Sequence, residues 1–276
     1  MSKLTPEDVV LRYSKRGMNI LKKYLKDGYC RTAAEKLLHA ERGTVLLTTG
    51  FYVAGYAETD GPLGTVAVAE ALNHLGFHSV VVTDKYCKGF FELKQLDVEY
   101  VDIAADEQVY EDILDKYKPV YMISIERCGE NAEHEYANMR GVSITSETAA
   151  IDHLFELAPE KHIPTIGVGD GGNEIGMGNV KDIISEKLEL NPCVVPVDDL
   201  IIATTSNWGA YALTAWLQKL SGEEVLFTFA EAEPYLAATL EIGSVDGVLK
   251  EKKMGVDGFD MTVEKEILDS LAEAIA

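Results

Sequence analysis

The sequence is poor in cysteine, and its four cysteines are widely spaced: Cys30, Cys87, Cys128 and Cys193. None of them forms a CxxC pair. This spacing excludes the usual zinc-site and disulfide-framework patterns. We therefore expect free thiols in a protein of a reducing compartment.

Long apolar runs are also missing. No stretch reaches the roughly 18 consecutive apolar residues that a membrane span needs. The N-terminal stretch from Met1 to Leu25 is polar and charged, without the apolar segment of a signal peptide. These absences predict a soluble, cytoplasmic protein with no membrane partner.

Positive charge is scarce as well. Lysine and arginine number 25 against 46 aspartates and glutamates, which gives a formal net charge of −21. Such a surface repels nucleic-acid backbones and anionic membranes, so a small molecule is the expected partner. The sequence also lacks GxSxG, GxxxxGK[ST] and HExxH, which argues against serine-hydrolase, P-loop and histidine-zinc chemistry.

What the sequence does contain is enough apolar material for a core, 47% of 276 residues. We predict a single α/β domain over 1–276, with N-terminal helices in 1–42, a βα core in 43–220 and a helical addition in 221–276. The N-terminal helices are candidates for a lid or a homo-oligomer interface.

Short apolar strands alternate with helices through the core. The predicted strands are 45–49, 79–83, 98–101, 120–124, 164–168 and 200–203. The predicted helices are 5–26, 32–40, 62–75, 86–96, 107–117, 148–157, 180–190, 208–220, 231–240 and 262–275, with a loop over 243–260. This alternation predicts an open, doubly wound, mostly parallel sheet with flanking helices and extra N- and C-terminal helices, since six strands are too few for an eight-stranded barrel.

Four loops rich in glycine and carboxylates follow strands of this sheet. They cover 49–65, 126–141, 169–178 and 206–211. In an open parallel sheet, ligands bind at the carboxyl ends of the strands, so we expect these loops to form one cleft.

The first loop ends in a helix start at Pro62. Asp60 is a candidate cap, and the free N–H groups near Gly61 could hold an anion. The alternative is a well-capped helix with no ligand.

In the third loop, Gly167 to Gly172 matches GxGxxG after a strand. The match alone is weak evidence for a dinucleotide, because Asp170 and Glu174 would repel a pyrophosphate. We favour a loop that directs Asp170, Asn173 and Glu174 toward a small polar ligand or a metal ion. A tight turn with solvated acids is the structural alternative.

The remaining two loops offer both binding and structural interpretations. Arg127 and Arg140 could bind a carboxylate bidentately or pair internally with an acid. Asn207 could donate to an oxyanion or cap a helix. Trp208 is a candidate ligand platform or a core residue.

These loops resemble the D-glutamate cyclase family. The resemblance is carried by Glu58–Gly64, Glu126-Arg127 with Asn138–Gly141, Gly169–Gly178 and Ser206–Tyr211. It implies a hydro-lyase that cyclises D-glutamate, or a related acidic amino acid, to 5-oxo-D-proline with loss of water. It also implies that Mn²⁺ or Mg²⁺ is plausible and that no nucleotide is needed.

On this basis we assign hypothetical roles. Arg127 or Arg140, with the helix start at Gly61, would hold the substrate carboxylates. The catalytic set is Asp170, Glu174, Asn207 and Glu126, with Asp170 or Glu174 as base and Asn207 at the oxyanion. The substrate-binding set is Thr49, Gly50, Thr59, Asp60, Gly61, Arg127, Asn138, Arg140, Gly171, Gly172, Asn173, Ser206 and Trp208. The metal set is Glu58, Asp60, Glu126 and Asp170.

In this scheme, Asn207→Ala would lower the rate on the order of a hundredfold. Two rival functions stay open. One is a nucleotide- or phosphate-dependent enzyme that uses the glycine loop, and the other is a protein that binds acidic amino acids without changing them.

Overall fold

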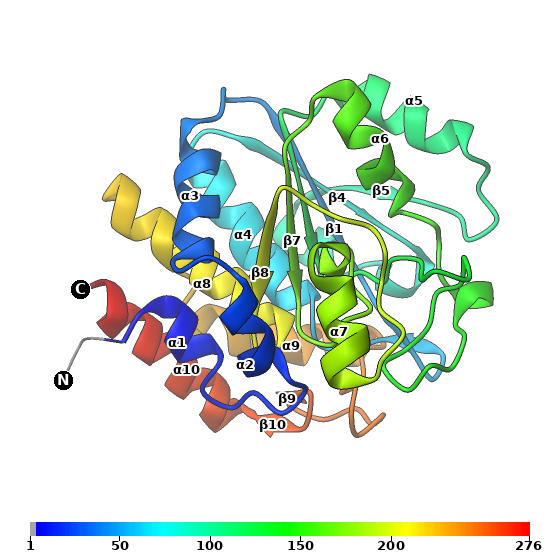
Figure 1. The fold of residues 1–276 in the computed structure, drawn as a ribbon. Helices are drawn as coiled ribbons and strands as arrows, with labels where there is room; N and C mark the ends of the chain where they lie inside the picture. Colours follow the sequence, from blue (N-terminus) through cyan, green and yellow to red (C-terminus); the bar gives the residue numbers. More distant parts are fainter. Residues whose placement is uncertain (1–3) are drawn as a thin grey trace.

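The computed structural model describes residues 4–276, and Met1 to Lys3 lie outside the described residues. Its centre is a six-stranded, all-parallel sheet (Figure 1). In spatial order the strands are β5 (Asp97–Tyr100), β4 (His78–Thr83), β1 (Thr44–Thr49), β6 (Tyr121–Ile125), β7 (Thr165–Gly169) and β8 (Asp199–Ile202). The predicted open α/β sheet is confirmed, and each predicted strand lies within one residue of the observed one at either end.

The strands are apolar because helices cover both faces of the sheet. Every residue of β6 and β7 is buried, as are all but the first residue of β1 and β4. On one face lie α3 (Tyr29–His39), α4 (Pro62–His74) and α8 (Ser206–Ser221), which pack against one another and against the sheet. On the other face lie α5 (Gln108–Tyr117), α6 (His153–Lys161) and α7 (Lys181–Leu188) (Figure 1).

The strand order reverses between β1 and β6. The chain runs outward from β1 through β4 to β5, then crosses back to β6 and continues to β7 and β8. Neighbouring loops at such a switch point diverge and leave a crevice at the carboxyl edge. The loops after β1 and β6 therefore frame the expected ligand position.

The two ends of the chain lie side by side. Helix α1 (Pro6–Val10) packs on α8 and on α10 (Met261–Ile275), and α9 (Phe229–Ile242) contacts α4 and α10 (Figure 1). No helix in the described part of the chain has the length and apolar character needed to cross a membrane.

The predicted helix over 5–26 is wrong. The chain leaves α1 at Leu11 and resumes as α2 (Met18–Leu21) and η1 (Lys22–Tyr24). Gly17 has φ of +84°, a left-handed conformation that a helix interior does not accommodate. The break turns the segment before Gly17 toward the carboxyl edge of the sheet.

The predicted helix over 86–96 is also wrong, because Gly89, with φ of +91°, separates two short 3₁₀ turns, η2 (Lys85–Cys87) and η3 (Phe91–Lys94). The predicted helix over 148–157 begins later, as α6. Two small hairpins were not predicted: β2 (Tyr52–Val53) with β3 (Tyr56–Ala57), and β9 (Gly255–Val256) with β10 (Phe259–Asp260). Further 3₁₀ turns lie between β6 and β7, as η4 (Thr145–Glu147), and between β7 and β8, as η5 (Met177–Val180).

Candidate active site

A cavity of about 260 Å³ lies at the carboxyl edge, at the switch point. Its wall comes from the loops after β1, β6 and β7, from the 247–257 segment, and from Arg16. Two of the predicted loops, those after β6 and β7, and the start of the loop after β1 therefore do converge. The fourth, at the start of α8, lies behind the wall rather than in it.

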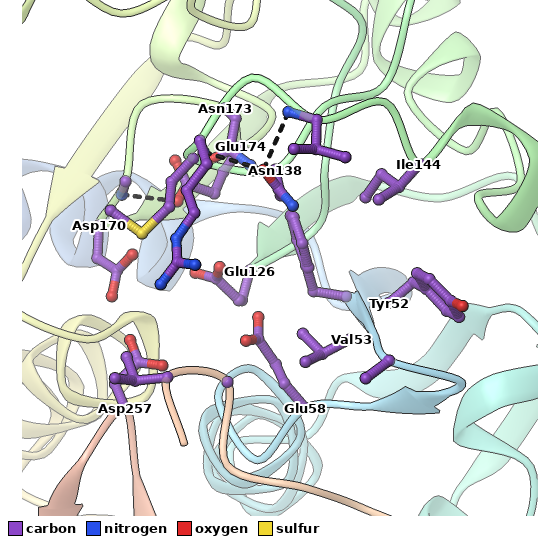
Figure 2. Close-up of a pocket in the computed structure, with 18 of the residues that line it drawn as sticks. Tyr52, Val53, Glu58, Glu126, Asn138, Ile144, Asp170, Asn173, Glu174 and Asp257 are labelled. Carbon is purple, nitrogen blue, oxygen red and sulfur yellow. Dashed lines mark hydrogen bonds between the residues drawn. The ribbon is translucent and has the colours of Figure 1, made fainter. Parts of the chain in front are cut away.

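Carboxyl groups dominate this cavity. Glu58, Glu126, Asp170, Glu174 and Asp257 all line it. Figure 2 shows the carboxyl groups of Glu58, Glu126, Asp170 and Asp257 around a shared space, whereas that of Glu174 turns back to its own loop. Burial, reinforced by mutual repulsion, raises the pKa of Glu58, Glu126 and Asp170 well above the ordinary carboxyl value. Burial therefore favours the protonated form of these groups, and the Arg16 guanidinium opposes this effect on the pKa of Asp170.

Glu126 follows β6 directly and has φ of +50°. A left-handed backbone is unfavourable for a residue with a Cβ, and such residues cluster at functional sites. The conformation brings its carboxyl group under the cavity, where Oε2 accepts a hydrogen bond of 2.5 Å from Ser206 Oγ. For Glu58, a hydrogen bond with Glu126 opposes the effect of burial on its pKa, so these two carboxyl groups are positioned to share a proton.

The glycine loop after β7 folds back on itself. The backbone N–H groups of Gly171 and Gly172 donate to the two oxygens of Glu174, each at 2.7 Å. A dinucleotide phosphate would need such N–H groups free, together with a helix N-terminus. Here Glu174 fills the position and α7 begins only at Lys181, so the GxGxxG match does not form a phosphate site.

Asp60, which precedes α4, caps the start of α8, and Asn207 of α8 caps the start of α4. Asp60 accepts hydrogen bonds from the N–H groups of Ser206 and Asn207 in α8, at 2.8 and 2.7 Å. Asn207 Oδ1 accepts from Gly61 and Gly64 at the start of α4, at 2.9 and 2.7 Å. The expected cap of Asp60 on its own helix is thus replaced by a crossed pair, which leaves no free anion site at Gly61.

Asn207 is fully buried, and its Nδ2 donates to Thr59 O at 3.0 Å. All of its side-chain polar groups therefore serve bonds within the protein, and it does not line the cavity. This placement favours the capping interpretation over the oxyanion one.

Arg127 has the internal ion pair that was the alternative to substrate binding. Its Nη1 donates to Asp84 Oδ2 at 2.6 Å and to Gly50 O at 2.9 Å, and Nη2 donates to Ala149 O at 2.6 Å. It is buried behind the cavity wall. Arg140, by contrast, is exposed at the cavity rim.

The other predicted site residues also divide into those that line the cavity and those that lie behind its wall. Asn138 lines the cavity and its Oδ1 ties down the backbone of Arg140 and Val142. Asn173 lines it and donates to Ala137 O. Trp208 is fully buried and donates to Glu264. Predicted site residues outside the cavity wall are Thr49, Gly50, Thr59, Asp60, Gly61, Arg127, Gly172, Ser206, Asn207 and Trp208.

Three charged residues of the wall were missed: Arg16, Lys250 and Asp257. Arg16 donates from Nη1 to Asp170 Oδ1 at 2.6 Å and from Nη2 to Asp257. Asp257 occupies the turn of the β9–β10 hairpin. The Asp257-Gly258 pair is a sequence signal for a tight hairpin turn, and it would have predicted the β9–β10 hairpin. Nothing local marks Arg16 as a site residue.

Three of the four residues predicted to bind a metal ion lie close together. Oxygen atoms of Asp60, Glu126 and Asp170 lie within 4.8 Å of one another, whereas Glu58 does not belong to this group. Asp170 Oδ2 is buried and has no hydrogen-bond partner. A set of three carboxylates with a free buried oxygen fits a hard divalent cation such as Mg²⁺ or Mn²⁺.

The raised pKa values predict how stability depends on pH. Burial and the charge of Asp257 raise the pKa of Asp60 from 3.8 to about 8. A carboxyl group with a raised pKa binds its proton more tightly in the folded chain, so its contribution to stability is lost as pH rises through this interval. In the presence of a metal chelator, we expect the free energy of unfolding, measured with urea, to fall between about pH 4 and pH 8. The fall should be less steep for Glu58→Gln, because this variant removes another carboxyl group whose pKa is raised. Parallel curves for the two proteins would contradict this.

Comparison with known proteins agrees with the geometry. The human protein named D-glutamate cyclase, mitochondrial, is 32% identical over 259 residues, which cover 80% of this chain. The chain spans 40% of the length of that human protein. Among solved structures, UDP-glucose 4-epimerase from Brucella ovis in complex with NAD shares 14% identity with a TM-score of 0.33, over 54% of this chain and 49% of that one.

The family described as D-glutamate cyclase-like, C-terminal, matches residues 7–272. That range includes the whole six-stranded sheet and every residue of the cavity wall. The cytoplasmic location stays a prediction. The chain belongs to the D-glutamate cyclase-like, C-terminal family.

Proposed function

We propose that this chain is a lyase that cyclises D-glutamate, or a closely related acidic amino acid, to 5-oxo-D-proline with loss of water. Two comparisons support the proposal: the family match and the name of the human relative. The observation that carries it is the set of buried carboxyl groups with raised pKa in one cavity: Glu58, Glu126 and Asp170.

The cavity volume, about 260 Å³, lies just below the range of about 300–1,000 Å³ that is usual for small-molecule sites. A single amino acid suits this volume and a dinucleotide does not. The occupied N–H groups of the glycine loop argue in the same direction.

The reaction forms one C–N bond and moves protons from the substrate nitrogen to the departing oxygen. The α-nitrogen of the substrate attacks its γ-carboxyl carbon, a C–N bond forms, and a C–O bond breaks. Two protons leave the ammonium group and two reach the departing oxygen, so no oxidant is needed. Because both reacting groups belong to one molecule, a folded substrate supplies a high effective concentration without a nucleoside triphosphate.

Buried carboxyl groups can carry these protons. Asp170 holds Arg16 with Oδ1 and has a free buried Oδ2, so we assign it to accept the amine proton. Glu126, whose pKa is raised, is assigned to donate a proton to the departing oxygen. Glu174 is less suited as the base, because both of its oxygens already accept backbone hydrogen bonds.

A divalent cation is an alternative way to compensate the same buried charge. Asp60, Glu126 and Asp170 would hold Mg²⁺ or Mn²⁺, which would polarise the γ-carboxyl group as a Lewis acid. Dependence of the reaction on added metal would show which form of compensation the site uses.

Positive charge at the cavity rim would assist entry of an anionic substrate. Arg140 and Lys250 line the cavity and are both exposed. In a protein with a net charge of −21, a local pair of cations directs an anion to the entrance.

The proposal is tested by incubating the purified chain with D-glutamate and with L-glutamate, each with chelator or with Mn²⁺. Mass spectrometry with chiral separation would follow loss of one water. We expect conversion of the D-isomer well above the rate in protein-free buffer. Binding without conversion would favour the non-catalytic binding protein, and neither binding nor conversion would refute both.

A further inference from the structure

Arg16 is held firmly within the carboxylate cluster although it comes from outside the βα core. It lies between α1 and α2, and its side chain is 18% exposed. The next residue, Gly17, lies so close to α7 that a Cβ there would be 2.3 Å from Leu188 Cδ2. The segment is therefore fixed against α7, and the guanidinium reaches the cavity wall.

The charge balance of the wall makes this guanidinium unusual. Arg16 forms ion pairs with Asp170 and Asp257, the only ion pairs of wall carboxylates within residues 4–276. The other cations of the wall, Arg140 and Lys250, are exposed at the rim. A substrate carboxylate that enters the buried part of the cavity would meet one suitable cation, and that cation is already engaged.

Asp257 is the partner that can be exchanged. It belongs to a two-residue hairpin turn, with φ of +53° at Asp257 and +79° at Gly258, which is typical of a type I′ turn. Its side chain is 4% exposed and points back into the cavity (Figure 2). Asp170, by contrast, sits at the end of a central strand.

We propose that Arg16 binds the α-carboxylate of the substrate, and that Asp257 occupies this place on the guanidinium until the substrate replaces it. The inference rests on the proposed function. Exchange of one carboxylate for another leaves the negative charge at the guanidinium unchanged, and the displaced Asp257 carboxylate, which sits on a hairpin turn, has to rotate out to solvent to keep its own charge hydrated.

The placement also orients the substrate. The α-carboxylate and the α-amine are attached to the same carbon atom. A carboxylate on Nη2 of Arg16 therefore puts the amine next to Asp170, which Nη1 holds at 2.6 Å. The γ-carboxyl group then extends toward Glu126, on the other side of the cavity from Asp257 (Figure 2). Arg16 is thus assigned to binding and Asp170 to proton transfer.

The test measures KM and kcat for D-glutamate and, by calorimetry, the Kd of glutarate, which has two carboxylates and cannot cyclise. Arg16→Lys is expected to raise both KM and Kd by about 10- to 100-fold, since a lysine ammonium lacks the fork with which Arg16 holds Asp170 on Nη1 and a second carboxylate on Nη2. Asp257→Asn is expected to lower both severalfold, because the competing carboxylate is removed. Asparagine tolerates the left-handed backbone, so the turn is retained. Asp257→Gly serves as a second variant without any side chain.

The matched control is Arg12→Gln, four residues earlier, where the arginine pairs with Glu266 on the surface. It should leave KM and Kd unchanged. A merely structural role for Arg16 and Asp257 would weaken binding in both variants. Unchanged Kd in Arg16→Lys, or equal or weaker binding in both Asp257 variants, would overturn the inference.

Failure of the proposed function can be told apart from failure of this inference. If no protein converts D-glutamate, the cyclase proposal fails and the glutarate Kd values alone decide the role of Arg16. If the wild type converts D-glutamate but the variants do not shift KM and Kd in opposite directions, the inference alone fails.

Discussion

Glu126→Gln is expected to lower kcat by about 10²- to 10⁴-fold, the range that a positioned general acid or base contributes. Glutamine retains the shape of the side chain and can accept the hydrogen bond from Ser206, but it cannot give up a proton as a carboxylic acid does. The variant should remain folded, because it removes a buried carboxyl group whose ionisation is unfavourable. Steady-state kinetics with D-glutamate, together with thermal unfolding, would measure both effects.

The matched control for this variant is Glu130→Gln. Glu130 lies in the same loop, but its side chain contacts His134 on the surface and does not line the cavity. Its kcat should equal that of the wild type. A Glu126→Gln protein that is folded and retains kcat within about tenfold of the wild type would exclude Glu126 as the proton donor.

The sheet was predictable because the signal for it is local. Each strand is a short apolar run, and each helix between strands has one apolar face, so the βα alternation can be recognised segment by segment. The parallel arrangement then places every βα loop at the same edge. That step correctly predicted a cavity lined by Glu126, Asp170 and Glu174 without any knowledge of their contacts.

The helix errors have a different origin. The patterns over 5–26 and 86–96 are compatible with a helix, but Gly17 and Gly89 adopt left-handed conformations. Whether a glycine ends a helix depends on what the chain packs against. Gly17 is required where the chain meets Leu188, a contact that lies far away in the sequence.

The site residues that were misplaced depend on contacts between distant segments. Arg16 reaches the cavity only because α1 packs on α8 and α10, and Asp257 only because the β9–β10 hairpin faces the same edge. Sequence patterns at the glycine-rich loops selected polar residues near the cavity, but they could not distinguish a side chain that faces the cavity from one that supports it from behind. Asp60, Arg127 and Asn207 are of the second kind, although a carboxylate oxygen of Asp60 still lies near Glu126 and Asp170.

Asn207→Ala is expected to reduce stability strongly and to change kcat little. The substitution would leave the buried N–H group of Gly64 without an acceptor and Thr59 O without its donor, while the N–H group of Gly61 would keep only Asp60 Oδ1 at 3.0 Å. Each buried polar group without a partner costs about 1–3 kcal/mol, so a loss of about 3–5 kcal/mol in the free energy of unfolding is expected after some relaxation. Urea unfolding at one pH would measure it.

The size of this effect follows from how α4 and α8 meet. Gly64 of α4 lies against α8 so closely that a Cβ would be 2.7 Å from the Cβ of Ala210. In so close a contact the buried N–H group of Gly64 has little access to water that could replace the lost acceptor. Asp60 closes the same junction from the other helix, which makes the two residues a single reciprocal unit.

Asn191→Ala provides the matched control, since the Asn191 side chain is exposed and bonds only to Glu133. Its stability should change by less than about 0.5 kcal/mol. An Asn207→Ala protein as stable as the wild type, with kcat reduced about a hundredfold, would restore the oxyanion role. The expected pattern, lower stability with kcat little changed, would mean that Asn207 acts by holding α4 and α8 together.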